Sequence, residues 1–134
     1  MRYLMIPLLL GLMPVAAGLT VPAQAADSAH RIDWTAAPMR LMLVERPGCQ
    51  WCAAWRAEIG PGYAASPQGR AAPLLAVDLD GPFPDGLALD RRAWLTPTFI
   101  LLHRGQELGR IEGYPGAQHF YPALTGLLSK APAE

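Results

Sequence analysis

Two cysteines, three positions apart, are the feature that most limits what this 134-residue chain can be. Cys49 and Cys52 are its only cysteines, and they lie between an apolar run, 41–44, and a helix-like stretch, 53–59. If the run is a strand and the stretch a helix, Cys49 stands at the helix N-terminus. Unpaired N–H groups and the helix dipole stabilise a thiolate there, and such sites lower a thiol pKa from about 8.5 to roughly 3.5–7.5. Because Cys52 is close enough to close a small ring with Cys49, the pattern predicts a nucleophile and its resolving thiol.

The start of the chain predicts export. Arg2 precedes an apolar segment, 4–19, and Ala23-Gln24-Ala25 fits the small-residue pattern of a cleavage site. The alternative is a transmembrane anchor, but the segment is shorter than the roughly 20 residues of a span and contains prolines. We therefore expect residues 1–25 to be a cleaved secretory signal peptide, cut near Ala25, and residues 26–134 to form one domain.

Export changes how the cysteine pair is interpreted. Outside the cytosol such a pair can stay oxidised. A bridge between Cys49 and Cys52 would close too small a ring to staple a fold, because the stabilisation grows with loop length. A redox role is therefore favoured over a structural one. Charge points to no polyanionic partner, because eleven Lys and Arg balance eleven Asp and Glu, with no basic stripe for nucleic acid.

The remaining pattern predicts an α/β domain. A βαβ unit followed by a ββα unit would give a mixed central sheet with helices on both faces. The segment 63–72 is expected to be mostly loop with room for one more helical turn, and Ile32 and Trp34 are expected to add an edge strand or cover the core. The expected strands are 40–46, 73–80, 98–102 and 107–112, and the expected helices are 50–59, a short one over 87–94 with Leu87, Leu89 and Trp94 packed inward, and 117–131.

Three motifs together resemble the thioredoxin-like superfamily. Cys49-Gln50-Trp51-Cys52 opens a helix within a βαβ unit, as in a thioredoxin-like redox motif. Thr96-Pro97-Thr98-Phe99 looks like the segment that carries the family's cis-proline, and 104–114 looks like its hairpin and following glycine. With the export signal, the Pro-Gly-Cys-x-x-Cys stretch is most similar to the small periplasmic SoxS-type proteins of bacterial sulfur-oxidation systems.

The resemblance implies a periplasmic thiol–disulfide oxidoreductase without a cofactor. Cys49 would attack and Cys52 would resolve, so that the two alternate between dithiol and disulfide. A cis bond at Pro97 would place Thr96 beside the cysteines, with its backbone available to an extended substrate segment; the alternative is an ordinary proline at a strand start. Trp51, expected to be exposed, would shape the surrounding substrate surface.

The resemblance also implies partners. The substrate would be a disulfide or cysteine adduct on a periplasmic protein, such as a sulfur-carrier protein. Electrons would come from a membrane dithiol transporter. We expect a monomer, and we expect reduction, although the same residues serve reductant, oxidant and isomerase.

Two departures from ordinary thioredoxins stand out. The residues between the cysteines are Gln50 and Trp51, where thioredoxin has Gly-Pro. The buried aspartate six positions before the first cysteine is replaced by Leu43, so the usual carboxylate proton relay is absent there. Glu45, two residues further on, is expected on the opposite face of the strand, and whether it substitutes stays open.

A second hypothesis is a copper-binding module. Cu(I) is a soft ion that favours thiolates, so Cys49 and Cys52 could hold it. Met39 and Met42 resemble copper-binding methionines, but their spacing is more typical of packing. No other metal site is expected, since the three histidines are scattered and zinc needs four ligands as a rule. Residue 53 is Ala rather than the His of a c-type haem motif.

Overall fold

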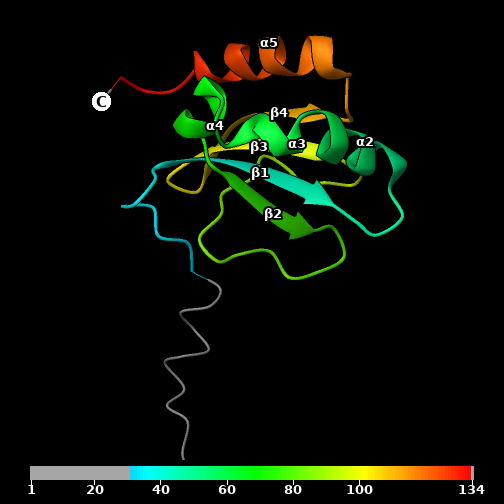
Figure 1. Ribbon diagram of the computed structural model, residues 1–134. Coiled ribbons are helices and arrows are strands. Elements are labelled where there is room, and N and C mark those ends of the chain that lie inside the picture. The colour runs from blue at the N-terminus through cyan, green and yellow to red at the C-terminus, as the bar shows by residue number, and fades with distance from the viewer. Residues whose placement is uncertain (1–30, 134) are drawn as a thin grey trace, which may run out of the picture.

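The computed structural model describes residues 31–133. The predicted signal peptide with its cleavage site lies outside the described residues, as does His30. Within them, no helix has the length and apolar character that a membrane span requires. The elements, labelled as in Figure 1, are β1 (Met39–Glu45), α2 (Gln50–Glu58), α3 (Gly60–Tyr63), α4 (Pro67–Ala71), β2 (Leu74–Asp78), β3 (Thr98–His103), β4 (Gln106–Glu112) and α5 (Ala117–Leu128).

The four strands form one mixed sheet in the order β2-β1-β3-β4. β1 pairs in parallel with β2 and antiparallel with β3, and β3 pairs antiparallel with β4. β1 is flanked on both sides, which explains why its centre, Leu41–Val44, is an unbroken apolar run that is fully buried. The predicted α/β class with a mixed sheet is confirmed.

The helices pack on one face of the sheet. Trp55 of α2 is the hub of that core, with its ring centroid 5.9 Å from Tyr63, 5.3 Å from Phe99 and 5.7 Å from Phe120. Leu41 and Leu43 supply the sheet side of this core. In Figure 1, α2, α3, α4 and α5 lie together on this side of the strands. Trp55 is fully buried and anchors α2 to the sheet.

The other face carries no helix within the described residues, which corrects the prediction of helices on both faces. Met42, Val44, Ile100 and Leu102 point to it and form a second core. It is covered by Trp34 and by the segment 79–97, which we term the connector and which runs beneath the sheet in Figure 1. Trp34 thus covers the core, one of its two expected roles.

The predicted helix over 87–94 is wrong because backbone groups of this stretch are bound elsewhere. Ala88 N–H donates to the Gly105 carbonyl (2.8 Å), and the Ala88 carbonyl accepts from Glu107 N–H (2.9 Å). This pairing keeps the stretch extended. Leu87 and Leu89 still pack on the second core, but Trp94 is 69% exposed instead of packed inward.

Two predictions about the helices are confirmed. The single helical turn expected within 63–72 is α4, whose N-cap Ser66 accepts a hydrogen bond from Gly69 N–H at 2.9 Å. α5 begins at Ala117, as predicted, continues through Pro122, which stands in its second turn, and ends at Leu128 rather than at residue 131. The hairpin is as predicted: Arg104 (φ 49°) and Gly105 (φ 88°) make its two-residue turn, a conformation that favours glycine.

Candidate active site

The cysteine motif lies where the sequence predicted it, at the junction between the end of β1 and the start of α2. Cys49 is the N-cap of α2, with extended φ and ψ of −77° and 107°. Its Sγ accepts a hydrogen bond from Cys52 N–H at 3.1 Å, so the sulfur takes the place of the oxygen of a usual N-cap side chain. Gly48, at φ 77°, makes the turn that brings the chain into this position. An N–H and the helix dipole therefore both favour negative charge on Sγ of Cys49.

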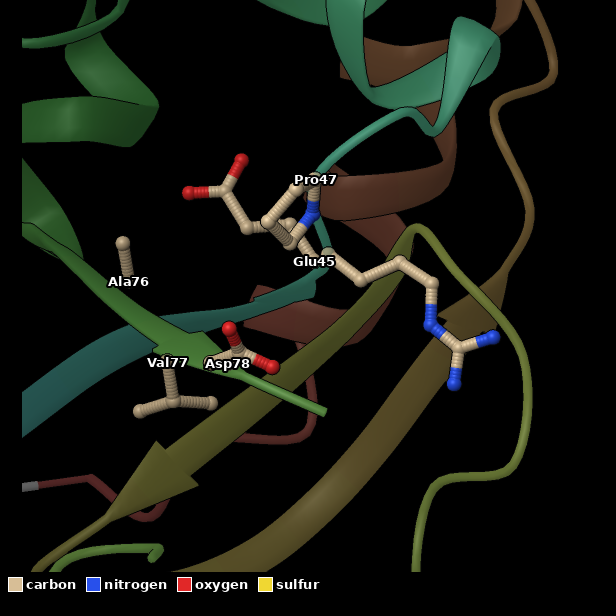
Figure 2. A pocket seen from close by; sticks show the side chains of 6 residues that line it. Glu45, Pro47, Ala76, Val77 and Asp78 are labelled. Atoms are coloured by element: carbon tan, nitrogen blue, oxygen red, sulfur yellow. The ribbon is translucent and has the colours of Figure 1, made fainter. Parts of the chain in front are cut away.

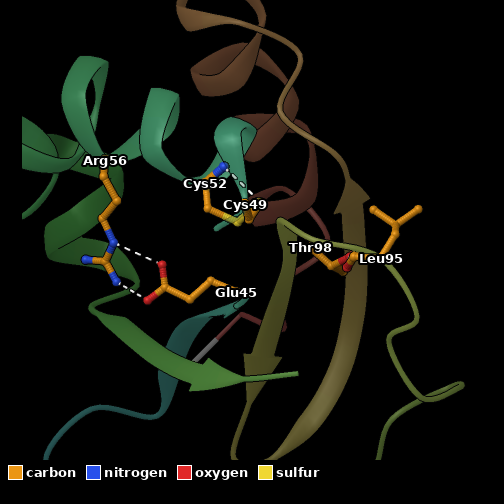
Figure 3. Close-up of a disulfide and its surroundings, with 6 residues drawn as sticks. All are labelled: Glu45, Cys49, Cys52, Arg56, Leu95 and Thr98. Atoms are coloured by element: carbon orange, nitrogen blue, oxygen red, sulfur yellow. Dashed lines mark hydrogen bonds and ion pairs between the residues drawn. A yellow bond between two sulfur atoms is a disulfide. The ribbon is translucent and has the colours of Figure 1, made fainter. Parts of the chain in front are cut away.

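The two sulfurs differ in their exposure. Cys49 is half-buried, whereas Cys52 faces the interior of the first turn of α2 and is only 4% exposed. The two are joined by a disulfide, with a Cα–Cα distance of 5.2 Å (Figure 3). An incoming group therefore has access to Cys49 and not to Cys52.

Thr96 and Pro97 lie at the same end of the sheet as the cysteine motif. β1 and β3 are antiparallel with Val44 opposite Thr98, so the residues after β1 and those before β3 emerge together. The Thr96–Pro97 peptide bond is cis, Pro97 is buried and Thr96 is half-buried. The Pro97 carbonyl accepts a hydrogen bond from Gly113 N–H at 2.8 Å. Neither backbone group of Thr96 has a backbone partner among the described residues.

Two tryptophans are the exposed large apolar side chains of the described residues. Trp51, between the cysteines, is 57% exposed, as expected. Trp94, two residues before Thr96, is more exposed still. The sequence predicted that Trp94 would pack inward from a helix, so its exposure was missed. Its place two residues before Thr96 was the signal that could have found it.

Glu45 lies on the same face as Leu43, and the expectation of the opposite face is wrong. Side chains alternate along a strand, so residues two apart share a face. The Glu45 carboxylate accepts two hydrogen bonds from the Arg56 guanidinium, one of them 3.1 Å from Nε to Oε2, and these raise the pKa of Arg56. Figure 3 shows the carboxylate directed at Arg56 and away from the disulfide.

A shallow hollow of about 350 Å³ lies beside this ion pair, against the ends of β1 and β2 (Figure 2). Glu45, Arg46 and Pro47 line it on one side, and Ala76, Val77 and Asp78 on the other. The cysteines are not part of its lining, so this hollow is separate from the reacting sulfurs.

Three apolar residues of β1 considered from the sequence, Leu43, Met39 and Met42, pack in or against the two cores of the sheet. Leu43, at the position of the missing aspartate, is fully buried against Trp55. Met42 is buried in the core of one face, whereas Met39 packs against the core of the other, so they do not form a pair. Within residues 31–133 no three side chains of His, Cys, Asp or Glu cluster in a way that could hold a metal ion.

The fold and the accessible cysteine at a helix N-terminus define a thioredoxin-like thiol–disulfide oxidoreductase. A solved structure described as the periplasmic thioredoxin SoxS from Paracoccus pantotrophus, in its reduced form, is 46% identical to this chain, with a TM-score of 0.69. The match covers 70% of this chain and 99% of that one. The chain therefore belongs to the thioredoxin family, and within it to the SoxS-like proteins.

A thioredoxin from Malassezia sympodialis, Mala s 13, is also similar, at 19% identity and a TM-score of 0.46, over 81% of this chain and 88% of that one. No protein-family model matches the chain, and a search of curated proteins found no match.

Proposed function

We propose that this oxidoreductase works in the periplasm as a reductant of disulfides or cysteine adducts on a partner protein. The observation that carries the proposal is the difference in exposure between Cys49 and Cys52. The more accessible, dipole-stabilised sulfur of Cys49 is suited to attack, and the buried sulfur of Cys52 is suited to resolve. The periplasmic assignment is supported by the predicted signal peptide and by the stated location of the SoxS homologue.

The reaction proceeds through one mixed disulfide. The Cys49 thiolate attacks a sulfur of the partner's disulfide, the S–S bond breaks, and the partner's second sulfur leaves as a thiolate that takes up a proton. Cys52, deprotonated, then attacks Sγ of Cys49 and releases the partner's other thiol. The oxidoreductase is left with the Cys49–Cys52 disulfide seen in the structure. Two electrons from a membrane dithiol donor would restore the reduced form.

Thr96, Pro97 and Trp51 would bind the partner. The free backbone groups of Thr96 are suited to pair with an extended segment, as in strand addition. Trp51 would add apolar contact beside the reacting sulfur. We propose that the partner is a cysteine-bearing protein such as a sulfur carrier, and that the oxidoreductase acts as a monomer.

Trapping tests this proposal. The Cys52→Ser variant should accumulate a mixed disulfide on Cys49 when mixed with a periplasmic extract, because the resolving step is removed. Mass spectrometry of the trapped species would identify the partner. The Cys49→Ser variant is the matched control and should trap nothing. Equal trapping by both variants would contradict the assigned roles.

The direction of electron flow has its own test. Equilibration with glutathione gives the reduction potential of the Cys49–Cys52 couple. A reductant should lie nearer to about −270 mV, typical of thioredoxin, than to about −120 mV, typical of a strong periplasmic oxidant. A value at the oxidising end would reverse the proposed direction.

A further inference from the structure

The second half of the connector has no helix or strand of its own, yet it leads directly into the Thr96–Pro97 motif. Two side chains of β4 bind its backbone. These are Glu107 and Arg110, which form a buried ion pair with side chains 1% and 6% exposed. Nε and Nη2 of Arg110 donate to Oε1 and Oε2 of Glu107 at 2.6 and 2.7 Å. The guanidinium and the carboxylate thus form a bidentate ion pair with fixed geometry.

Each member of the pair also binds one backbone group of the connector. Asp90 N–H donates to Oε2 of Glu107 at 2.9 Å. Nη2 of Arg110 donates to the carbonyl of Arg91 at 2.7 Å. Two successive residues of the connector are therefore held by one rigid unit of β4, at a point where the chain forms no ladder.

Further contacts hold the chain between this point and β3. Ala93 is buried in the second core. The Leu95 carbonyl accepts a hydrogen bond from Oγ1 of Thr98 at 2.8 Å, drawn in Figure 3. Trp94, between these two contacts, projects into solvent. The segment Asp90–Pro97 is thus fixed at several points while Trp94 stays outside.

The Glu107–Arg110 ion pair is unusually buried for two charged side chains. Replacing a buried ion pair by apolar side chains of similar volume is often neutral or stabilising, so stability alone does not explain Glu107 and Arg110. Apolar side chains at these two positions could not form hydrogen bonds with Asp90 N–H or the Arg91 carbonyl.

We propose that Glu107 and Arg110 are positioning residues that hold the segment Asp90–Pro97 ready for a protein substrate. They present Trp94 and the backbone of Thr96 at the end of the sheet that carries the cysteine motif, so that the segment need not be ordered at each binding event. The inference rests on the proposed function, because it assumes that proteins, and not only small disulfides, are reduced. A small disulfide requires only the two cysteines and gains nothing from the segment.

The test compares a large and a small substrate. Removing both charges, in the variant Glu107→Leu/Arg110→Leu, leaves no buried charge unpaired but removes both partners of the connector backbone. The KM for insulin disulfides should rise about tenfold, since ordering of the segment would then oppose binding, with little change in kcat. Reduction of oxidised glutathione should stay within about twofold of the wild type, because its rate depends on Cys49.

Two further variants keep the test decisive. Arg91→Ala removes the exposed Arg91–Glu112 ion pair (2.6 Å) of the same network but keeps the Arg91 carbonyl, so it should behave as the wild type. Arg110→Lys keeps a positive charge beside Glu107 but loses the planar fork, and should raise the KM for insulin in the same direction by a smaller factor. It serves as the test should the double variant fail to fold.

Hydrogen exchange separates failure of this inference from failure of the proposed function. The amide of Asp90 should lose protection in the double variant, while the amide of Cys52 keeps it. If the Asp90 amide loses protection but the KM for insulin does not change, the positioning role would be overturned. Equal losses in the rates of insulin and glutathione reduction would overturn it too. A wild-type protein that reduces glutathione but not insulin would instead overturn the proposed protein substrate, and unchanged protection of Asp90 would overturn the anchoring itself.

Discussion

The two halves of the active site are built in different ways. The cysteine half, from Gly48 to Cys52, is fixed by local interactions: the end of β1, the first turn of α2 and a hydrogen bond spanning three residues. The half around Thr96 and Pro97 is fixed by residues that follow it in the chain, such as Glu107 and Gly113. The reacting sulfurs therefore lie on a unit held by local interactions, whereas the proposed substrate-binding segment depends on tertiary contacts.

The largest expected effect comes from removing the support under the cysteine half. Trp55→Ala would leave a large cavity at the hub of the aromatic core and lower the free energy of unfolding by about 3–5 kcal/mol. Urea unfolding measures this loss, and reduction of both glutathione and insulin should fall. Trp51→Ala, at an exposed position of the same helix, is the control and should change stability by less than about 0.5 kcal/mol. A small loss in Trp55→Ala would show that the helix is not held by this packing.

The next effect concerns the hairpin that supports the connector. In Gly105→Ala a Cβ would lie 2.3 Å from the Gly86 carbonyl oxygen and would stand at φ 88°, so both space and conformation oppose it. The free energy of unfolding should fall by more than about 1 kcal/mol. Gly62→Ala, where a Cβ meets nothing within 4 Å, should be neutral or stabilising by up to about 1 kcal/mol. Equal behaviour of the two variants would contradict the close approach between the hairpin turn and Gly86.

Acid should loosen the half of the site around Thr96 and Pro97 before the cysteine half. Burial opposes ionisation of Glu107, but hydrogen bonds from Arg110 and Asp90 N–H and the charge of Arg91 outweigh it and hold the pKa of Glu107 below its usual range. This contribution to stability is complete above the unfolded value of about 4.3 and is lost as pH falls through the lower folded value. The stability difference between the wild type and the Glu107→Leu/Arg110→Leu variant should therefore shift in the variant's favour on acidification. A pH-independent difference would contradict the charged state of the pair.

The smallest expected effect concerns the hydrogen bond between Tyr114, in the segment after β4, and Glu58 of α2. The Tyr114 hydroxyl donates to Glu58 at 2.6 Å, and partial burial followed by this bond raises the pKa of Tyr114 to about 12. The contribution is complete below the unfolded value of about 10 and is lost as pH rises toward 12. Tyr114→Phe should cost at most about 1.5 kcal/mol at pH 7, measured by urea unfolding, and should remove this alkaline loss. A wild-type protein with no such alkaline loss would contradict the hydrogen bond.

The sequence predicted the half of the site that is local. An apolar run, two cysteines and a helix-like stretch are adjacent, so Cys49 could be placed at the N-terminus of a helix from neighbours alone. The connector was misjudged because its conformation is set by Gly105, Glu107 and Arg110, which lie beyond it in the chain. No local pattern shows that backbone groups of Ala88 and Asp90 are bound elsewhere, so Leu87 and Leu89 were misread as helical.

The role of Cys49 as the attacking thiolate is tested most directly by the pH dependence of its alkylation in the reduced protein, with Cys52→Ser used to isolate the Cys49 thiol. Iodoacetamide reacts with the thiolate, so the rate reports the pKa of Cys49. A midpoint below about 7.5, well under the 8.5 of a free thiol, is the expected result for a sulfur at a helix N-terminus. A midpoint at or above 8.5 would show that α2 does not stabilise the anion, and the assignment of Cys49 as the attacking group would be contradicted.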